Sequence, residues 1–218
     1  MQHTTQRIDI GRLTIVTIFS LLMVANMIGI YRDSKAVEPL STIKIATMIH
    51  HLLIVCFYGL FVLLYLMRRA ARSTTKSLVV KAVAVIATFV PFAIPVLSRP
   101  VNDPCILFFA DLVTTIGMII ALYSLSALGR SLSIIPQARS LVRTGLYKVV
   151  RHPVYLGELI AILGIVLARF SLSALAVFCL LTALQIYRAL QEEKLLAGVF
   201  PEYGSYSLKV ARFIPGIF

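Results

Sequence analysis

The chain has 218 residues, of which 59% are hydrophobic and only 14% are charged, and its mean hydropathy is +0.92. Soluble domains are typically about half apolar and about a quarter charged, so this composition excludes an ordinary water-soluble domain. The formal net charge of +12 would suit nucleic acid, but the sequence has no basic stripe interleaved with aromatic residues of the kind that binds single strands. We therefore expect a membrane protein that binds no nucleic acid.

Six stretches of the chain are almost free of charge. A transmembrane helix needs about 20 apolar residues, within a range of about 17 to 25. In chain order the stretches are 13–31, 45–67, 82–98, 104–129, 153–168 and 170–187. The third is marginal and carries Pro91 and Pro95, and the fifth is short and carries Glu158. We expect an all-α integral membrane protein with five to six transmembrane helices, whose last two stretches form a helical hairpin that turns near Arg169.

The basic residues are distributed unevenly between the two ends of these stretches. Of the 21 Lys and Arg residues, 16 lie in segments 1–12, 68–81, 128–152 and 188–218. The other five lie in 32–44 and 99–103 and at Arg169. Basic loops are enriched on the cytosolic side of a membrane, so we expect both termini in the cytosol. Segments 128–152 and 188–218 would then form a polar cytosolic lobe.

Polar residues inside the spans are candidates for function. Asp111 lies within the fourth stretch, where an ionisable group either has a function or hydrogen-bonds a neighbouring helix, and both interpretations stay open. His50 and His51 are adjacent, so their side chains point about 100° apart on a helix. With no Cys or acid near them in the sequence, we expect a structural role. The three cysteines have no paired spacing, so we expect neither a disulfide nor a metal site.

The first polar segment that suggests chemistry runs from residue 129 to residue 157. Pro153 suits the first turn of a helix, since its fixed φ is helical and a first-turn N–H has no partner in any case. His152 would then lie at the helix start, where free backbone N–H groups favour a carboxylate or a phosphate. Gly157 permits the close approach of another backbone or of a ligand. The alternative is a basic helix start at a membrane surface, because short motifs produce many false positives.

Two more polar segments follow the last apolar stretch. Arg188 and Glu192 are four residues apart, so one helical face would present a cation and an acid, with Glu193 beside them. The alternative is a surface ion pair worth about 0.3–0.5 kcal/mol, although acids near the hydrocarbon are costly and usually have a function. Residues 200–215 are too short to span a membrane and too apolar to extend into water. We expect them to form a cap folded over the cytosolic end.

These segments divide the chain into two parts of different character. Residues 1–104 consist of apolar stretches joined by short basic loops. Residues 105–218 combine the last spans with the polar segments 128–152 and 188–218. We therefore expect N-terminal transmembrane helices followed by a core that carries the function.

The order and spacing of the polar segments resemble a known enzyme family. The string Leu141-Val142-x-x-Gly145-x-Tyr147-x-x-x-Arg151-His152-Pro153-x-Tyr155-x-Gly157 is similar to one in the isoprenylcysteine carboxyl methyltransferases and their bacterial relatives. So are Arg188-x-x-x-Glu192-Glu193 and the closing elements Phe200-x-x-Tyr203-x-x-Tyr206 and Arg212-x-Ile214-Pro215. The phospholipid N-methyltransferases share the His-Pro-x-Tyr and paired-Glu elements. The resemblance covers about residues 125–218.

The resemblance implies an S-adenosylmethionine-dependent methyltransferase of a bacterial plasma membrane, with a cytosolic cofactor-binding lobe. Its lipophilic acceptor, such as an isoprenylcysteine carboxylate, would come from the bilayer. Arg188 would face the acceptor, and Glu193 would belong to the catalytic part of the site. The implied cofactor-binding residues are Arg139, Ser140, Leu141, Val142, Tyr147, His152, Pro153, Val154, Tyr155, Gly157 and Glu192. Glu158 departs from the eukaryotic prenylcysteine enzymes, which have an aromatic residue there, and an acid would suit a cationic or hydroxyl-bearing acceptor.

Other interpretations remain open. The acceptor could be a small hydrophobic thiol or a phospholipid amine, and a protonated amine must first lose a proton, whereas a carboxylate or thiolate needs no general base. An NADPH oxidoreductase similar to the membrane sterol reductases would use Arg139, Arg143 and Arg151 for the 2′-phosphate of its cofactor. A non-catalytic membrane protein would use the same motifs only to fix its helix ends.

Overall fold

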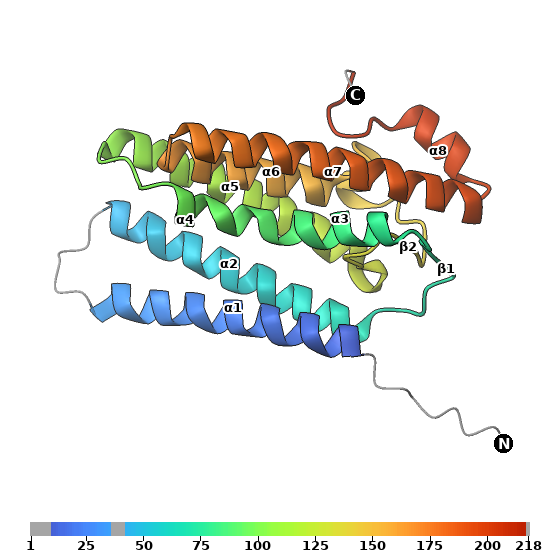
Figure 1. Ribbon diagram of the computed structural model, residues 1–218, viewed down its shortest axis with the longest axis horizontal. Coiled ribbons are helices and arrows are strands. Elements are labelled where there is room, and N and C mark those ends of the chain that lie inside the picture. The colour runs from blue at the N-terminus through green and yellow to red at the C-terminus, as the bar shows by residue number, and fades with distance from the viewer. Residues whose placement is uncertain (1–9, 36–41, 217–218) are drawn as a thin grey trace.

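The computed structural model describes residues 10–35 and 42–216 and consists almost entirely of helices (Figure 1). Within these residues, five helical segments are long and apolar enough to cross a membrane: Gly11–Lys35, Lys44–Met67, Leu78–Leu97, Pro104–Ser131 and Leu172–Val199. The expected all-α integral membrane fold is therefore confirmed. The expected position of the N-terminus concerns residues 1–9, which lie outside the described residues.

The first four spans match the expected stretches. Three of them are the helices α1 (Ile10–Lys35), α2 (Thr42–Met67) and α5 (Pro104–Leu128). The third span consists of α3 (Leu78–Phe89), the 3-10 turn η1 (Val90–Phe92) and α4 (Ala93–Leu97). The regular helix is interrupted at Pro91, because proline has no N–H to donate. The span begins earlier than expected, since the Ser77 side chain caps the helix by accepting from the backbone N of Val80 at 3.4 Å.

Helices α6 (Pro153–Ala168) and α7 (Leu172–Val199) form the expected hairpin. The chain turns at Arg169, whose Nη1 donates to the backbone O of Ser98 at 2.8 Å. The 16 residues of α6 rise about 24 Å, less than the ~30 Å hydrocarbon core of a bilayer. Helix α7 extends beyond the apolar stretch 170–187 and ends at Val199. The paired acids Glu192 and Glu193 therefore belong to the last transmembrane helix itself.

Helices α5 and α6 pack so closely that their backbones touch. A Cβ atom added to Gly117 of α5 would lie 2.2 Å from the backbone N of Ala161. A Cβ atom added to Gly157 of α6 would lie 2.5 Å from the backbone N of Ala121. Small residues are typical of helix contacts in membranes, where close backbone packing replaces the hydrophobic effect as the main source of association. This contact fixes the first turns of α6 against α5.

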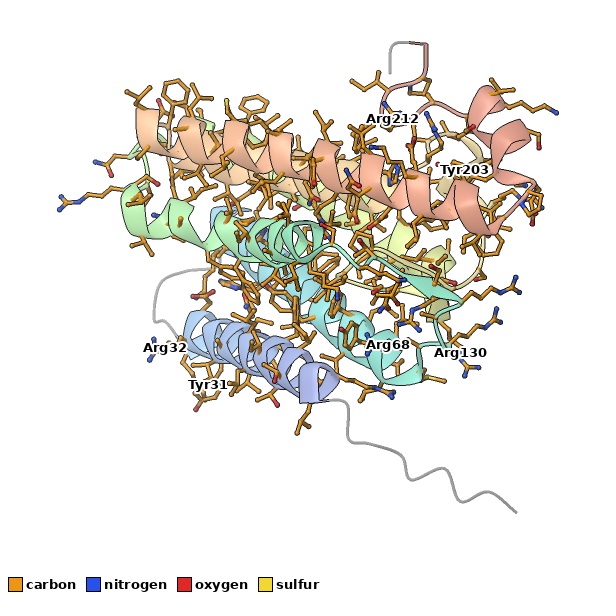
Figure 2. All side chains as sticks on the ribbon, turned by 45° about the vertical axis from the view of Figure 1, so that its right-hand side comes forward. Tyr31, Arg32, Arg68, Arg130, Tyr203 and Arg212 are labelled. Atoms are coloured by element: carbon orange, nitrogen blue, oxygen red, sulfur yellow. The ribbon has the colours of Figure 1, made fainter. Side chains whose placement is uncertain are left out.

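The polar segments gather at one end of the helical bundle. At this end, which we call the proximal end, α1 begins, α2 and α7 finish and α6 begins (Figure 1). Here β1 (Ser73–Thr74) pairs antiparallel with β2 (Gln137–Ala138). The backbone N of Arg69 also donates to the O of Arg130 at 2.9 Å. Figure 2 shows Tyr203 and Arg212 where α7 finishes, and Tyr31 and Arg32 at the opposite, distal end.

The N-terminal helices share a core with the rest of the chain. Phe19 of α1 and Phe61 of α2 stack with their ring centroids 4.2 Å apart. They belong to one buried cluster with Leu125 of α5 and Val154 of α6. The division of the chain at residue 104 stays a prediction, and this shared core crosses it.

Candidate active site

The chain just before α6 is extended and paired with the C-terminal segment. The backbone N of Arg151 donates to the O of Ala211 at 2.8 Å, and the N of His152 donates to the O of Arg212 at 3.2 Å. These two bonds join residues that are about sixty positions apart in the sequence. The position of His152 therefore depends on how the end of the chain folds back.

Residues 200–216, which we call the C-terminal cap, pack on the proximal end. The cap contains helix α8 (Tyr203–Lys209), and its residues Tyr203, Tyr206 and Phe213 are buried. The Tyr206 hydroxyl donates to the backbone O of Tyr147 at 2.7 Å. Burial raises the pKa of Tyr206 to about 12, so the phenol keeps its proton at neutral pH. The segment is folded over this end of the bundle, as the sequence predicted.

Glu193 of α7 connects the cap to the start of α6. One of its carboxylate oxygens accepts from Nε2 of His152 at 3.0 Å and from Nε of Arg212 at 2.9 Å. The other oxygen accepts from Nη1 of Arg151 at 2.9 Å and from Nη2 of Arg212 at 3.1 Å. Both oxygens of this buried carboxylate are therefore engaged by the protein itself. The role that follows is the positioning of neighbouring segments.

His152, Tyr155 and Glu192 form a second group of contacts beside this one. The His152 ring stacks on the Tyr155 ring, with centroids 5.5 Å apart and 3° between the planes. The Tyr155 hydroxyl donates to Oε1 of Glu192, whereas Oε2 of Glu192 lies 3.8 Å from Nδ1 of His152. Because Nε2 of His152 is bound to Glu193, its Nδ1 faces Glu192. Glu192 keeps acceptor capacity that Glu193 lacks.

A cavity of about 670 Å³ runs from the proximal end into the bundle. Its proximal part is lined by Ser140, Leu141, Val142, Tyr147, His152, Tyr155, Glu192, Leu196 and Tyr206. Further into the bundle it is lined by apolar side chains, among them Phe57, Phe61, Ile162, Ile165 and Leu181. One cavity thus joins a polar compartment to an apolar one.

Three polar side chains form a hydrogen-bonded chain within this cavity. Nε2 of Gln185 donates to Oε2 of Glu158 at 2.8 Å, and Nη1 of Arg188 donates to Oε1 of Gln185 at 3.1 Å. Nη2 of Arg188 donates to the backbone O of Ile134 at 3.1 Å. The guanidinium also lies over the Tyr155 ring, 4.7 Å from its centroid, where a cation is attracted to the π face. The Gln185 amide therefore separates an acid from a cation.

The two charged ends of this chain retain unused hydrogen-bonding atoms. Arg188 is only 4% exposed, and its Nε atom has no hydrogen-bond partner. In the described part of the chain, no donor reaches Oε1 of Glu158. An unmade hydrogen bond to a buried polar group costs about 1–3 kcal/mol. Because both residues line the cavity, a ligand in the cavity is the natural partner for these atoms.

Part of the chain that lines this cavity is similar to a family of membrane enzymes. Residues 105–203 match the family model described as phospholipid methyltransferase. The matched stretch contains α5, α6 and α7 and the whole Glu158–Gln185–Arg188 chain. No curated protein matches the chain. The likeness to this family favours methyl transfer over the oxidoreductase interpretation.

Most of the site residues expected from the sequence line the cavity of this methyltransferase-like region. Those that line it are Ser140, Leu141, Val142, Tyr147, His152, Val154, Tyr155, Arg188 and Glu192. Those that do not are Arg139, Pro153, Gly157 and Glu193. Arg139 hydrogen-bonds Gln137, Pro153 forms the first turn of α6, and Gly157 packs against α5. These four residues lie outside the cavity lining, and their expected roles at the site stay predictions.

The cavity also contains residues that the sequence did not single out for the site. Gln185, Tyr203 and Tyr206 are the main ones. Gln185 is a polar residue inside an apolar stretch, and that signal was available in the sequence. The two tyrosines reach the cavity because the C-terminal cap folds back, and the sequence predicted the cap but not which of its side chains face the cavity. Within residues 10–35 and 42–216, no three His, Cys, Asp or Glu side chains are grouped to hold a metal ion.

We predict that Glu193→Gln loosens the C-terminal cap. The amide removes the negative charge that Glu193 presents to Arg151 and Arg212, and breaking a buried ion pair costs about 3–5 kcal/mol. Hydrogen exchange measured by mass spectrometry should show the backbone amides of Arg151 and His152 exchanging at least about tenfold faster.

Glu202→Gln is the matched control, because this acid is exposed at the start of α8 and caps nothing with its side chain. It should leave the exchange unchanged. Equal protection in the Glu193 variant and the wild type would mean that buried side chains alone hold the cap.

Proposed function

We propose that the protein transfers a methyl group from S-adenosylmethionine to a lipophilic acceptor that enters from the bilayer. The observation that carries this proposal is the continuity of the cavity, which has a polar part at the proximal end and an apolar part among the helices. A soluble cofactor and a lipid-borne acceptor can meet only in a space of this kind. The family match supports methyl transfer as the reaction.

The proximal part of the cavity fits S-adenosylmethionine in three respects. Helix α6 starts there, and His152 does not cap it with its side chain, so the N–H groups of Val154 and Tyr155 remain for a carboxylate. Glu192 has an oxygen for the amine or the ribose hydroxyls of the cofactor. An apolar surface suited to adenine is provided by Leu141, Val142 and Leu196.

The protein's contribution to the reaction is mainly alignment. The sulfonium of the cofactor supplies a methyl group that is already activated, so binding both reactants in line lowers most of the barrier. The Glu158–Gln185–Arg188 chain supplies the groups that can orient the acceptor. Its apolar surroundings exclude water, which would otherwise weaken these contacts.

The two ends of the Glu158–Gln185–Arg188 chain support two different classes of acceptor. An isoprenylcysteine carboxylate-like acceptor is supported by Arg188, because a guanidinium binds a carboxylate with matching planar geometry. A phospholipid amine is supported by Glu158, which can attract an ammonium group and accept the proton that it must lose before methylation. The description of the matched family favours the second class, and the resemblance of the motifs favours the first.

We predict that His152→Ala and Glu192→Ala each weaken the binding of S-adenosylhomocysteine at least tenfold, measured by calorimetry on the purified protein. Each change removes a polar group from a partly desolvated site, where a hydrogen bond to a charged group is worth about 1.5–3 kcal/mol. Glu202→Gln should bind like the wild type. Unchanged affinity in both alanine variants, or tight binding of NADPH to the wild type, would contradict the cofactor assignment.

We predict that two conservative variants respond in opposite ways, depending on the acceptor. With a carboxylate acceptor, Arg188→Lys should lose at least about tenfold in turnover, because Lys keeps the charge but not the bidentate geometry, whereas Glu158→Gln should retain most activity. With an amine acceptor, Glu158→Gln should be the severe change. A screen of lipid extracts with a radiolabelled methyl donor identifies the acceptor. Near-normal turnover in both variants would mean that the Glu158–Gln185–Arg188 chain does not contact the acceptor.

We further propose that the proximal end faces the cytosol, because most Lys and Arg residues lie in segments at that end. A single cysteine at Thr74, which is exposed in β1, should react with an impermeant maleimide only after the cells are permeabilised. The background is a variant without Cys56, Cys105 and Cys179, which are all exposed. Labelling of position 74 in intact cells would reverse the orientation.

A further inference from the structure

The cavity has a second polar region at its distal end, which the proposed methyl transfer does not use. Asn26 of α1, His50 and His51 of α2 and Asp111 of α5 line it. Asp33 of α1 lies beside them, with its Oδ2 3.7 Å from Nε2 of His51. We call these five residues the distal cluster. The expected structural role of the two histidines assumed that no acid was near them, and the fold brings two acids to them from other helices.

The hydrogen bonds of the distal cluster determine the orientation of the His51 ring. Nδ2 of Asn26 donates to the backbone O of Leu22 at 2.8 Å, which leaves its Oδ1 to accept from Nδ1 of His51 at 3.2 Å. In a neutral ring, Nε2 of His51 then carries a lone pair that faces the Asp33 carboxylate. Gly29 makes room for the ring, since a Cβ there would lie 3.2 Å from Cε1 of His51. With the ring neutral, two acceptors face each other with no donor between them.

Other polar atoms of the distal cluster are also unsatisfied. Nδ1 of His50 and Oδ2 of Asp33 are buried without a hydrogen-bond partner. Among the residues that the structure describes, Asp111 has neither a hydrogen bond nor an ion pair, although it lines the cavity. Ionisable groups inside a membrane are costly, and they usually face a partner or a substrate. The distal cluster therefore offers several acceptors to a ligand in the cavity.

An apolar stretch of cavity separates the distal cluster from Glu158. Glu158 follows Gly157, which packs at the level of Gly117 on α5, and Asp111 precedes Gly117 by six residues. At about 1.5 Å per residue, Asp111 lies about 9 Å farther toward the distal end. Ile162 and Ile165, which follow Glu158 toward the distal end of α6, line the cavity with apolar side chains. This spacing suits an amphiphile with its polar head at the distal cluster and its chain along the cavity.

We propose that the distal cluster binds the ammonium group of a long-chain amine. An ammonium group has three donors and no acceptor, and it would supply the missing donor between His51 and Asp33 and a counter-charge for Asp111. A phosphate or carboxylate head would instead meet two carboxylates of like charge. Arg169 also lines this end of the cavity, but its Nη1 is bound to the Ser98 carbonyl. Binding at this site requires neither the cofactor nor methyl transfer.

The test uses hexadecylamine with a diazirine beside the amine, added to the full-length protein in detergent without cofactor. After illumination, mass spectrometry should find the label on peptides from the distal parts of α1, α2 and α5. Asp111→Asn and, as a second variant, His51→Gln should reduce this labelling at least about tenfold. Glu202→Gln is the control at the opposite end, and thermal unfolding checks that each variant is folded. The same chain with a carboxylate head serves as the matched probe.

Three results would overturn the proposal. The first is labelling that persists in both folded variants, which would mean that the distal cluster does not hold the head group. The second is labelling confined to α6 and α7 around Glu158, which would place the amine at the proposed acceptor site instead. The third is equal labelling by the carboxylate probe, which would indicate that only the hydrocarbon chain is recognised. Because no cofactor is present, a failure of the proposed methyl transfer leaves the outcome of this test unaffected.

Discussion

The arrangement of the proximal end depends on the neutralisation of one buried carboxylate. Glu193 accepts hydrogen bonds from Arg151, His152 and Arg212, which come from two segments far apart in the sequence. Charges removed from water are stable only when their geometry is good and their hydrogen bonds are made. A carboxylate with both oxygens engaged meets that condition in one arrangement of the three partners. The C-terminal cap, the start of α6 and the end of α7 are therefore fixed relative to one another.

The neighbouring acid has a different role for a geometric reason. Consecutive side chains on a helix point about 100° apart, so Glu192 turns toward the cavity while Glu193 turns toward the cap. Glu192 is held by the Tyr155 hydroxyl but still has an oxygen exposed to the cavity. Of these two adjacent acids, Glu193 stabilises the fold, whereas Glu192 is placed to contact a ligand in the cavity. The close contact of α5 and α6 keeps Tyr155 in register with this pair.

The sequence predicted the positions of the helices better than the contacts that their residues make with distant segments. Hydropathy located the spans, and the proline rule placed the start of α6 at Pro153, because both depend on local chemistry. The resemblance located a group of residues that line the proximal part of the cavity. It could not show that Glu193 turns away from the cavity, since that depends on where Arg212 lies after the chain folds back. Gly157 was open to two interpretations, and only the position of α5 shows that it packs against another backbone. The distal cluster was missed because its members come from three helices.

The Gln185 amide explains how an acid and a cation can share an apolar cavity without cancelling each other. A direct ion pair between Glu158 and Arg188 would occupy both charged groups and leave little for a ligand. The amide instead donates to Glu158 with its nitrogen and accepts from Arg188 with its oxygen, so its orientation is fixed by the charges on either side. Each charged group is partly satisfied, which lowers the cost of burial, and each still has an unused atom. A hydrocarbon residue at position 185 would satisfy neither group, and a second charge would neutralise one of them. A neutral amide is thus the side chain that keeps both groups buried and available to a ligand in the cavity.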